Sequence, residues 1–240
     1  MKIALIPIYN EESTLGAVLE SAGRWADYLV LVDDGSTDRS ARIAQEWLAT
    51  TGKQGNLIAL PENQGMGAAL KAGFVHIARG LEAVRWRPTD LVVFVDADGQ
   101  YPDDAPLKLC AHLEAGGWDV ASVRRDFSLY PAYKRLGNSL LSRWASLLCG
   151  RRFFDIEAGL RVMRARVVPS LLEYFAGERY SCSQEIGILS VLLGFKVDNS
   201  LVQPVSYYRS RTRVLDFLRN AAEGLMASQR ARSRRKLPAA

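Results

Sequence analysis

Apolar runs of strand length alternate with helical segments through the first hundred residues of the chain. The helical segments are expected over residues 13–24, 39–49 and 65–79. The apolar runs, expected to be strands, cover residues 3–8, 28–32, 57–60 and 91–95. A repeated strand–helix order predicts a mainly parallel sheet with helices on both of its faces, a Rossmann-like α/β fold.

The second half of the chain continues with a less regular pattern. Further helices are expected over residues 103–115, 133–148, 184–193 and 215–230, and strands or extended segments over 120–123, 160–163, 195–197 and 202–207. No internal repeat or long linker divides the 240 residues. We expect one catalytic domain over residues 1–215, followed by an amphipathic helix and a basic tail over 216–240.

The triplet Asp96-Ala97-Asp98 directly follows the apolar run that ends at Val95. Ligands of open α/β sheets bind at the carboxyl ends of the strands, so both carboxylates are expected at such a site. Magnesium uses one or two carboxylates together with substrate phosphates. The triplet therefore predicts a site for Mg²⁺ or Mn²⁺ that bridges protein and phosphate.

Acidic residues also follow the second strand, where Asp33 and Asp34 stand. By analogy with the acidic residue of dinucleotide-binding folds, they are candidates for reading a ribose or a base. The sequence contains neither the glycine fingerprint of dehydrogenases after the first strand nor a P-loop, which disfavours both classes. A phosphatase of the haloacid dehalogenase type is also disfavoured, because three strands precede the acidic triplet and Gln100 follows its glycine.

Composition adds a cellular context. We see no apolar run long enough for a transmembrane helix, and the N-terminal segment is expected to be the first strand rather than a leader peptide. The three cysteines, Cys110, Cys149 and Cys182, have neither metal-ligand nor disulfide spacing, so we expect reduced thiols in the cytoplasm. His76 and His112 are expected to have surface or packing roles.

The net charge of +5 is concentrated towards the C-terminus, where residues 230–236 hold four arginines and one lysine. Two amphipathic helices, expected over 133–148 and 215–230, carry leucines interleaved with basic residues. Such helices can lie in a membrane interface, where each basic residue contributes about 1 kcal/mol on an anionic surface. Packing on the core or a homo-oligomer interface is the alternative for these apolar faces. We expect no nucleic acid partner.

Four motifs together resemble the family 2 inverting glycosyltransferases of GT-A fold over roughly residues 2–215. Within that family, the segments at 155–161 and 184–197 are most similar to those of dolichol-phosphate mannose synthases and related polyprenyl-phosphate glycosyltransferases. The four motifs are Ile6-Pro7-Ile8-Tyr9-Asn10-Glu11-Glu12, Val32-Asp33-Asp34-Gly35-Ser36-Thr37-Asp38, Asn63-Gln64-Gly65 with Gly67, and Asp96-Ala97-Asp98-Gly99-Gln100-Tyr101-Pro102.

The resemblance implies a role for each matching position. The donor would be a nucleotide sugar, either GDP-mannose or a UDP-hexose, and the acceptor a polyprenyl phosphate at the inner face of the membrane. The nucleotide pocket would be formed by Pro7, Tyr9, Glu11, Asp33, Asp34 and Asp96. The metal and diphosphate would be held by Asp96, Asp98 and Gln100, the donor sugar and phosphates by Asp155 and Arg161, and the acceptor phosphate by Arg209, Arg211 and Glu185.

The nature of the acceptor decides whether the reaction needs a base. A phosphate monoester is largely a dianion at neutral pH and needs only positioning, with Asp98 and Arg161 acting on the leaving diphosphate. A sugar or small-molecule hydroxyl needs a carboxylate base, for which Asp155 and Glu185 are the candidates. Two alternatives stay open: a family 2 enzyme with a hydroxyl acceptor, and a non-catalytic nucleotide-sugar-binding interaction protein.

Overall fold

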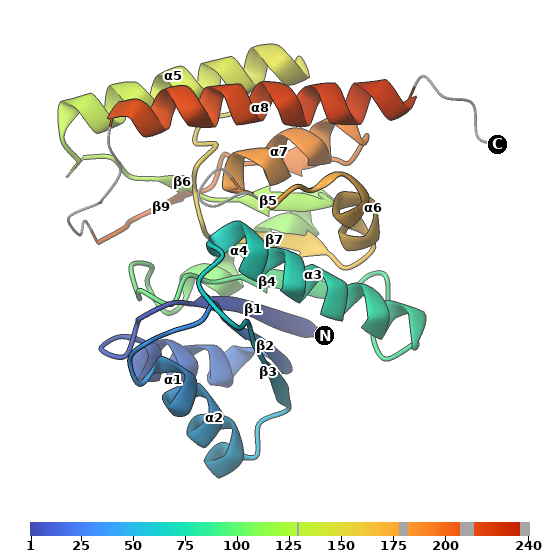
Figure 1. Cartoon of the computed structure of the whole chain (residues 1–240). Helices are drawn as coiled ribbons and strands as arrows, with labels where there is room; N and C mark the ends of the chain where they lie inside the picture. The colour runs from blue at the N-terminus through green and yellow to red at the C-terminus, as the bar shows by residue number, and fades with distance from the viewer. Residues whose placement is uncertain (129, 178–181, 207–213, 236–240) are drawn as a thin grey trace.

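The computed structural model describes residues 1–128, 130–177, 182–206 and 214–235 (Figure 1). A seven-stranded sheet has the order β3-β2-β1-β4-β7-β5-β8, and β6 pairs with β9 in a separate two-stranded sheet. The strands are β1 Lys2–Ile8, β2 Tyr28–Asp33, β3 Gly55–Ala59, β4 Leu91–Phe94, β5 Val120–Ser122, β6 Arg124–Arg125, β7 Arg161–Arg164, β8 Val197–Asp198 and β9 Val202–Gln203. The helices are α1 Leu15–Trp25, α2 Ser40–Thr51, α3 Met66–Glu82, α4 Ala105–Gly116, α5 Ala132–Cys149, α6 Val167–Tyr174, α7 Cys182–Leu192 and α8 Val214–Arg235.

The large sheet is mainly parallel, which confirms the α/β fold expected from the sequence. Strands β1 to β4 all run in one direction, and only β7 runs against its two neighbours, β4 and β5. Ile8 at the end of β1 lies beside Asp33 at the end of β2. Phe94, the last residue of β4, lies beside Arg161, the first residue of β7. The reversal of β7 therefore brings an arginine to the edge where the parallel strands end.

The core lies on both faces of the sheet, because alternate residues of a strand point to opposite faces. In β1, Ile3 and Leu5 contribute to one core cluster with α3, whereas Ala4, Ile6 and Ile8 contribute to the other with α1. This two-sided burial explains why residues 3–8 are apolar at every position rather than at every second one.

Helices α5 and α8 form an outer layer over α7, at the end of the molecule farthest from β3 (Figure 1). The side chain of Trp144 in α5 donates a hydrogen bond from Nε1 to the carbonyl oxygen of Ala221 in α8, at 3.0 Å. α8 begins at Val214. Within the described part of the chain, no helix is both long and apolar enough to cross a membrane.

Two elements of the structure were not expected from the sequence. β6 has only two residues, too few to produce an alternating pattern. α6 contains two valines and Pro169 in its first turn, and these residue types have low helix propensity. Proline is tolerated there because the first turn of a helix has no intrahelical partners for its N–H groups.

No disulfide joins the three cysteines in the structure. Cys110 and Cys182 are buried and Cys149 is partly buried, and all three are free.

Candidate active site

The acidic pair Asp96 and Asp98 lies on a short loop after β4. Ala97 between them is buried against α1, whereas both carboxylates are only half-buried. Thr14, next to the start of α1, donates a hydrogen bond from Oγ1 to the carbonyl oxygen of Ala97 at 2.8 Å. The backbone N–H of Gln100 donates to Asp98 Oδ1 at 3.1 Å. The backbone of Ala97 thus anchors the loop to Thr14, and the two flanking carboxylates stay partly exposed.

The ionised forms of the two carboxylates are disfavoured. Burial, followed by the charge of Asp98, raises the pKa of Asp96 to about 7, even though Arg125 and Arg161 act in the opposite direction. Burial also raises the pKa of Asp98. Because raised carboxylate pKa values report unfavourable negative charge, a cation at this pair would be stabilising.

The donor set also fits a divalent cation. Asp96 and Asp98 offer hard oxygen ligands, and their half-exposure leaves other coordination positions for phosphate and water. Among the described residues, no group of three or more His, Cys, Asp or Glu side chains could hold a metal ion. A cation here would therefore depend on the substrate for part of its coordination, as magnesium does in phosphate-binding sites.

Arg125 lies in β6, and its guanidinium forms a fork with Asp155. Nε donates to Oδ2 at 2.8 Å and Nη2 to Oδ1 at 2.9 Å, while the backbone N–H of Arg125 donates to Oδ2 at 3.0 Å. Asp155 is completely buried, and the Arg125 side chain keeps 19% of its surface exposed. The sequence identified Asp155 as a site residue but not Arg125. Arg125 comes just after strand β5, which ends at the same edge of the sheet, and this position could have indicated that Arg125 belongs to the candidate site.

Arg161 enters the site from the opposite direction, at the start of the reversed strand β7. It is buried, and its Nη2 donates to the carbonyl oxygen of Ser183 at 2.9 Å. Burial lowers the pKa of Arg161 to about 10, so the side chain keeps its charge at neutral pH. The site thus combines two aspartates with two arginines, an arrangement suited to a diphosphate bound between a cation and fixed positive charge.

The expected nucleotide-binding residues lie at the ends of β1 and β2. Tyr9 is 40% exposed just after β1, whereas Pro7 and Glu11 are half-buried. Asp34 is buried, and its two oxygens accept hydrogen bonds from the backbone N–H groups of Gln64 and Gly65, at 2.8 and 2.7 Å. Asp34 therefore ties the loop before α3 to the end of β2.

Asp33 has an unused hydrogen-bonding position. Its Oδ2 accepts a bond from the N–H of Ser36 at 3.2 Å. Its Oδ1 is buried and has no hydrogen-bond partner among the described residues. An unsatisfied buried oxygen at the ligand edge of the sheet fits a ribose or base donor group.

Of the residues expected at the acceptor, Glu185 is described and Arg209 and Arg211 lie outside the described residues. Glu185 is buried at the start of α7. Its carboxylate accepts bonds from the N–H groups of Ala176 and Gly177, at 2.7 and 3.2 Å, and pairs with Arg230 of α8 at 2.5 Å. Both carboxylate oxygens of Glu185 therefore accept hydrogen bonds, and these bonds connect α7 to the loop before it and to α8.

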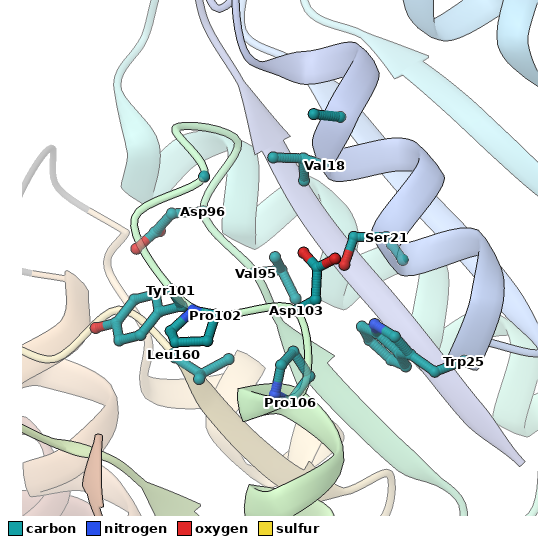
Figure 2. Close-up of a pocket in the computed structure, with 13 residues that line it drawn as sticks. Val18, Ser21, Trp25, Val95, Asp96, Tyr101, Pro102, Asp103, Pro106 and Leu160 are labelled. Atoms are coloured by element: carbon teal, nitrogen blue, oxygen red, sulfur yellow. The ribbon is translucent and has the colours of Figure 1, made fainter. Parts of the chain in front are cut away.

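A small cavity lies behind the acidic loop, between that loop and α1 (Figure 2). Its volume is about 110 Å³, and it is lined by apolar groups including Val18, Trp25 and Leu160. Asp103 and Ser21 point towards one another at its edge (Figure 2). Ligand pockets occupy roughly 300–1,000 Å³, so a nucleotide sugar would have to bind at the open sheet edge instead.

Comparison with known proteins gives a consistent family. Residues 3–154 match the family described as Glycosyl transferase family 2. The chain is 34% identical over 175 residues to the undecaprenyl-phosphate 4-deoxy-4-formamido-L-arabinose transferase of Shewanella sediminis, covering 70% of this chain and 50% of that protein. The enzyme of the same name from Edwardsiella ictaluri is 31% identical over the same shares. The chain spans about half the length of these curated relatives.

Solved structures share the fold. The glucosyl-3-phosphoglycerate synthase of M. tuberculosis superposes with a TM-score of 0.64 at 16% identity, covering 100% of this chain and 82% of that one. A further structure of the same enzyme, with Mn²⁺ and UDP-glucose bound, gives a TM-score of 0.63 at 20% identity, covering 100% and 80%. The architecture is therefore the GT-A fold, and the chain belongs to glycosyltransferase family 2.

Proposed function

We propose that this glycosyltransferase moves a hexose from a nucleotide-diphosphate sugar to a polyprenyl phosphate, with inversion, at the cytoplasmic surface of a membrane. Its named relatives are transferases for undecaprenyl phosphate, which supports a lipid-phosphate acceptor. We also propose that residues 1–215 form the catalytic domain and that residues 216–240 serve as a membrane-facing segment. The three free cysteines are in keeping with a reducing compartment.

The observation that carries this proposal is the fork between Arg125 and Asp155. A buried carboxylate holds the guanidinium in one orientation, and a fifth of the arginine side chain stays exposed at the site. Nε and Nη2 of this guanidinium donate to Asp155, which leaves the N–H groups of the preoriented Nη1 to donate to phosphate oxygens. Both carboxylates that the sequence offered as bases, Asp155 and Glu185, are instead paired with arginines. That pairing suits an acceptor that needs no deprotonation.

Each residue of the candidate site would have a separate role in this reaction. Asp96 and Asp98 would hold Mg²⁺ or Mn²⁺, with Gln100 beside them, and the cation would neutralise charge on the leaving diphosphate. Arg161 adds fixed positive charge beside the same carboxylates. Arg125 orients the acceptor phosphate, which is largely a dianion at neutral pH because its second pKa is about 6. Asp33 and Asp34, with Pro7, Tyr9 and Glu11, form the nucleotide side.

A hydroxyl acceptor is the second candidate, and one observation favours it. Glu157, two residues after Asp155, has its pKa raised by burial, and its Oε1 accepts a hydrogen bond from Asn220 of α8 at 2.7 Å. A carboxylate with a raised pKa can serve as a general base. A hydroxyl-transferring enzyme would place its base there, and Glu157→Gln would then abolish transfer while the Asp98 and Arg125 functions remained.

The decisive experiment supplies the purified chain with labelled nucleotide sugars, Mn²⁺ or Mg²⁺, and polyprenyl phosphate. The donors to compare are GDP-mannose, UDP-N-acetylhexosamine and UDP-glucose, the last of which the M. tuberculosis neighbour binds. We expect label to enter the organic phase from one donor, and to be absent with EDTA or in Asp98→Asn. Donor turnover with label only in water-soluble products would contradict the lipid acceptor and support a hydroxyl one.

A further inference from the structure

Exposed apolar side chains gather on the two outer helices. Of the eleven large hydrophobic residues that are exposed in the described part of the chain, six lie on α5 and α8. On α5 they are Tyr133, Leu136, Leu140 and Leu147, which are 56, 61, 55 and 78% exposed. On α8 they are Leu225 and Met226, which are 39 and 44% exposed. The spacing of three, four and seven residues along α5 places its four side chains on one stripe.

The opposite sides of both helices pack inward. Leu141 and Ala145 of α5 and Ala227 and Ala231 of α8 are buried in the same core cluster. The helices lie side by side (Figure 1), joined by the Trp144–Ala221 bond and by a hydrogen bond from Arg232 to the carbonyl oxygen of Leu148 at 2.6 Å. The exposed apolar residues of both helices therefore point outward together, as one surface that we call the α5–α8 face.

The charge around the α5–α8 face is positive. α5 contains no Asp or Glu, and its Arg135 and Arg143 are exposed. On α8, Arg232 and Arg219 are exposed, although Arg219 forms an ion pair with Glu223 at 2.9 Å. A second copy of the chain would bring a like-charged surface against this one. An anionic bilayer supplies both the apolar interior and the opposite charge.

Helix α5 carries part of the α5–α8 face on its outer side and contacts Arg125 of the candidate site with its inner side. Nη2 of Arg125 donates a hydrogen bond to Oδ1 of Asn138 at 3.5 Å. Asn138 is buried on the inner side of α5, whereas Leu136 and Leu140 are exposed on the outer side of the same turns. A lipid whose phosphate reaches Arg125 would thus meet the protein beside this end of the face.

We infer that the α5–α8 face rests on an anionic membrane surface and presents the Arg125 side of the active site to lipid headgroups. The inference deepens the proposed function, since it specifies how a lipid-embedded acceptor would be reached. A bilayer rather than a second copy is the expected partner because the face combines leucines with Arg135 and Arg143, which form no ion pair with any residue that the structure describes.

The test is flotation of the purified chain with vesicles of phosphatidylcholine, with and without phosphatidylglycerol. We expect flotation with the anionic vesicles that weakens in high salt. The double variant Leu140→Glu/Leu147→Glu should bind these vesicles at least about tenfold more weakly, because two large apolar side chains are lost from the interface. Leu107→Glu is the matched control, since Leu107 is 41% exposed on α4, and it should float like the unmodified chain.

Equal flotation of the double variant and the unmodified chain would overturn the inference. An unmodified chain that fails to float, and that sediments as a dimer which the double variant splits, would overturn it too and assign the face to a second copy. Circular dichroism and thermal melting confirm that each variant is folded.

A transfer assay separates this inference from the proposed function. With a short, water-soluble prenyl phosphate, the double variant should keep the rate of the unmodified chain, and with acceptor in vesicles it should lose most of it. Suppose that no prenyl phosphate is glycosylated, but that the double variant still floats less than the unmodified chain. The proposed function would then be wrong, and the inference that the α5–α8 face binds membranes would hold.

Discussion

Gly159 lies directly against Asp96, the first carboxylate of the acidic pair. A Cβ at position 159 would come within 2.0 Å of Asp96 Oδ2, far inside van der Waals contact. The glycine belongs to the segment that carries Asp155, Glu157 and Arg161, so the two halves of the candidate site meet at this point. A single methyl group here would displace the Asp96 carboxylate.

Gly159→Ala should therefore impair catalysis without unfolding the protein. Misplacing a reacting group by about 1 Å can reduce a rate about a hundredfold, and we expect a loss of about ten- to a hundredfold in kcat. The control is Gly16→Ala in α1, where a Cβ meets nothing within 4 Å. Steady-state rates and thermal melting of both variants check the prediction, and an unchanged rate in Gly159→Ala would rule out a role for the Asp96 position.

Asp98→Asn should uncouple nucleotide binding from the metal. An amide is a weaker ligand than a carboxylate, so Mn²⁺ should no longer tighten binding of UDP or GDP, and transfer should fall by about a hundredfold or more. Isothermal titration of the nucleoside diphosphate with and without Mn²⁺ measures this directly. Asp103→Asn is the control: its carboxylate lies on the same segment but is 70% exposed and pairs with Arg24. Metal-enhanced binding that survives in Asp98→Asn would refute the assigned site.

Asp155→Asn should lower both stability and acceptor affinity. The change leaves the Arg125 guanidinium without its buried counter-charge, and breaking such a pair lowers the free energy of unfolding by about 3–5 kcal/mol. Arg125→Lys keeps the charge but loses the fork, so it should mainly raise the KM for the acceptor. Urea denaturation and kinetics with varied acceptor distinguish the two. Equal acceptor KM values in Arg125→Lys and the unmodified chain would exclude Arg125 from the acceptor site.

Asp119 should make stability depend on acid pH. Burial alone would raise its pKa, but hydrogen bonds from Arg166 at 2.6 Å and from the backbone N–H of Lys196 at 2.9 Å outweigh it and hold the pKa below the ordinary value of 3.8. A carboxyl whose pKa is lowered by folding stabilises the protein above its unfolded pKa. That contribution is lost as the pH falls from about 4 through the folded value.

Asp119→Asn should accordingly lower the free energy of unfolding at pH 7 by about 1–2 kcal/mol. The difference from the unmodified chain should shrink as the pH falls from about 4, where Asp119 of the unfolded chain takes up a proton, through the lower pKa of the folded chain. Asp104→Asn, which removes an exposed pair with Lys108, should change stability by less than about 0.5 kcal/mol. Denaturation at several pH values checks both variants, and a pH-independent difference for Asp119→Asn would contradict the assigned cause.

The sequence by itself determined the sheet and the acidic pair. Strand-length apolar runs that alternate with helices predict a mainly parallel sheet buried on both faces. Asp96 and Asp98 lie at the edge where its parallel strands end, because they follow closely after β4. Both features depend on residues that are close together in the sequence, so local patterns are enough to predict them.

The tertiary structure decided which partners each charged residue has. Arg125 meets Asp155 from thirty residues away, and Glu185 meets Arg230 from forty-five, across elements whose packing no local pattern specifies. The same is true of α6 and β6, whose residues have no strong preference for their conformation. Long-range packing therefore brought Arg125 to the candidate site. It also paired Asp155 and Glu185, the two carboxylates that the sequence had offered as bases, because buried charges require partners that only the folded chain brings together.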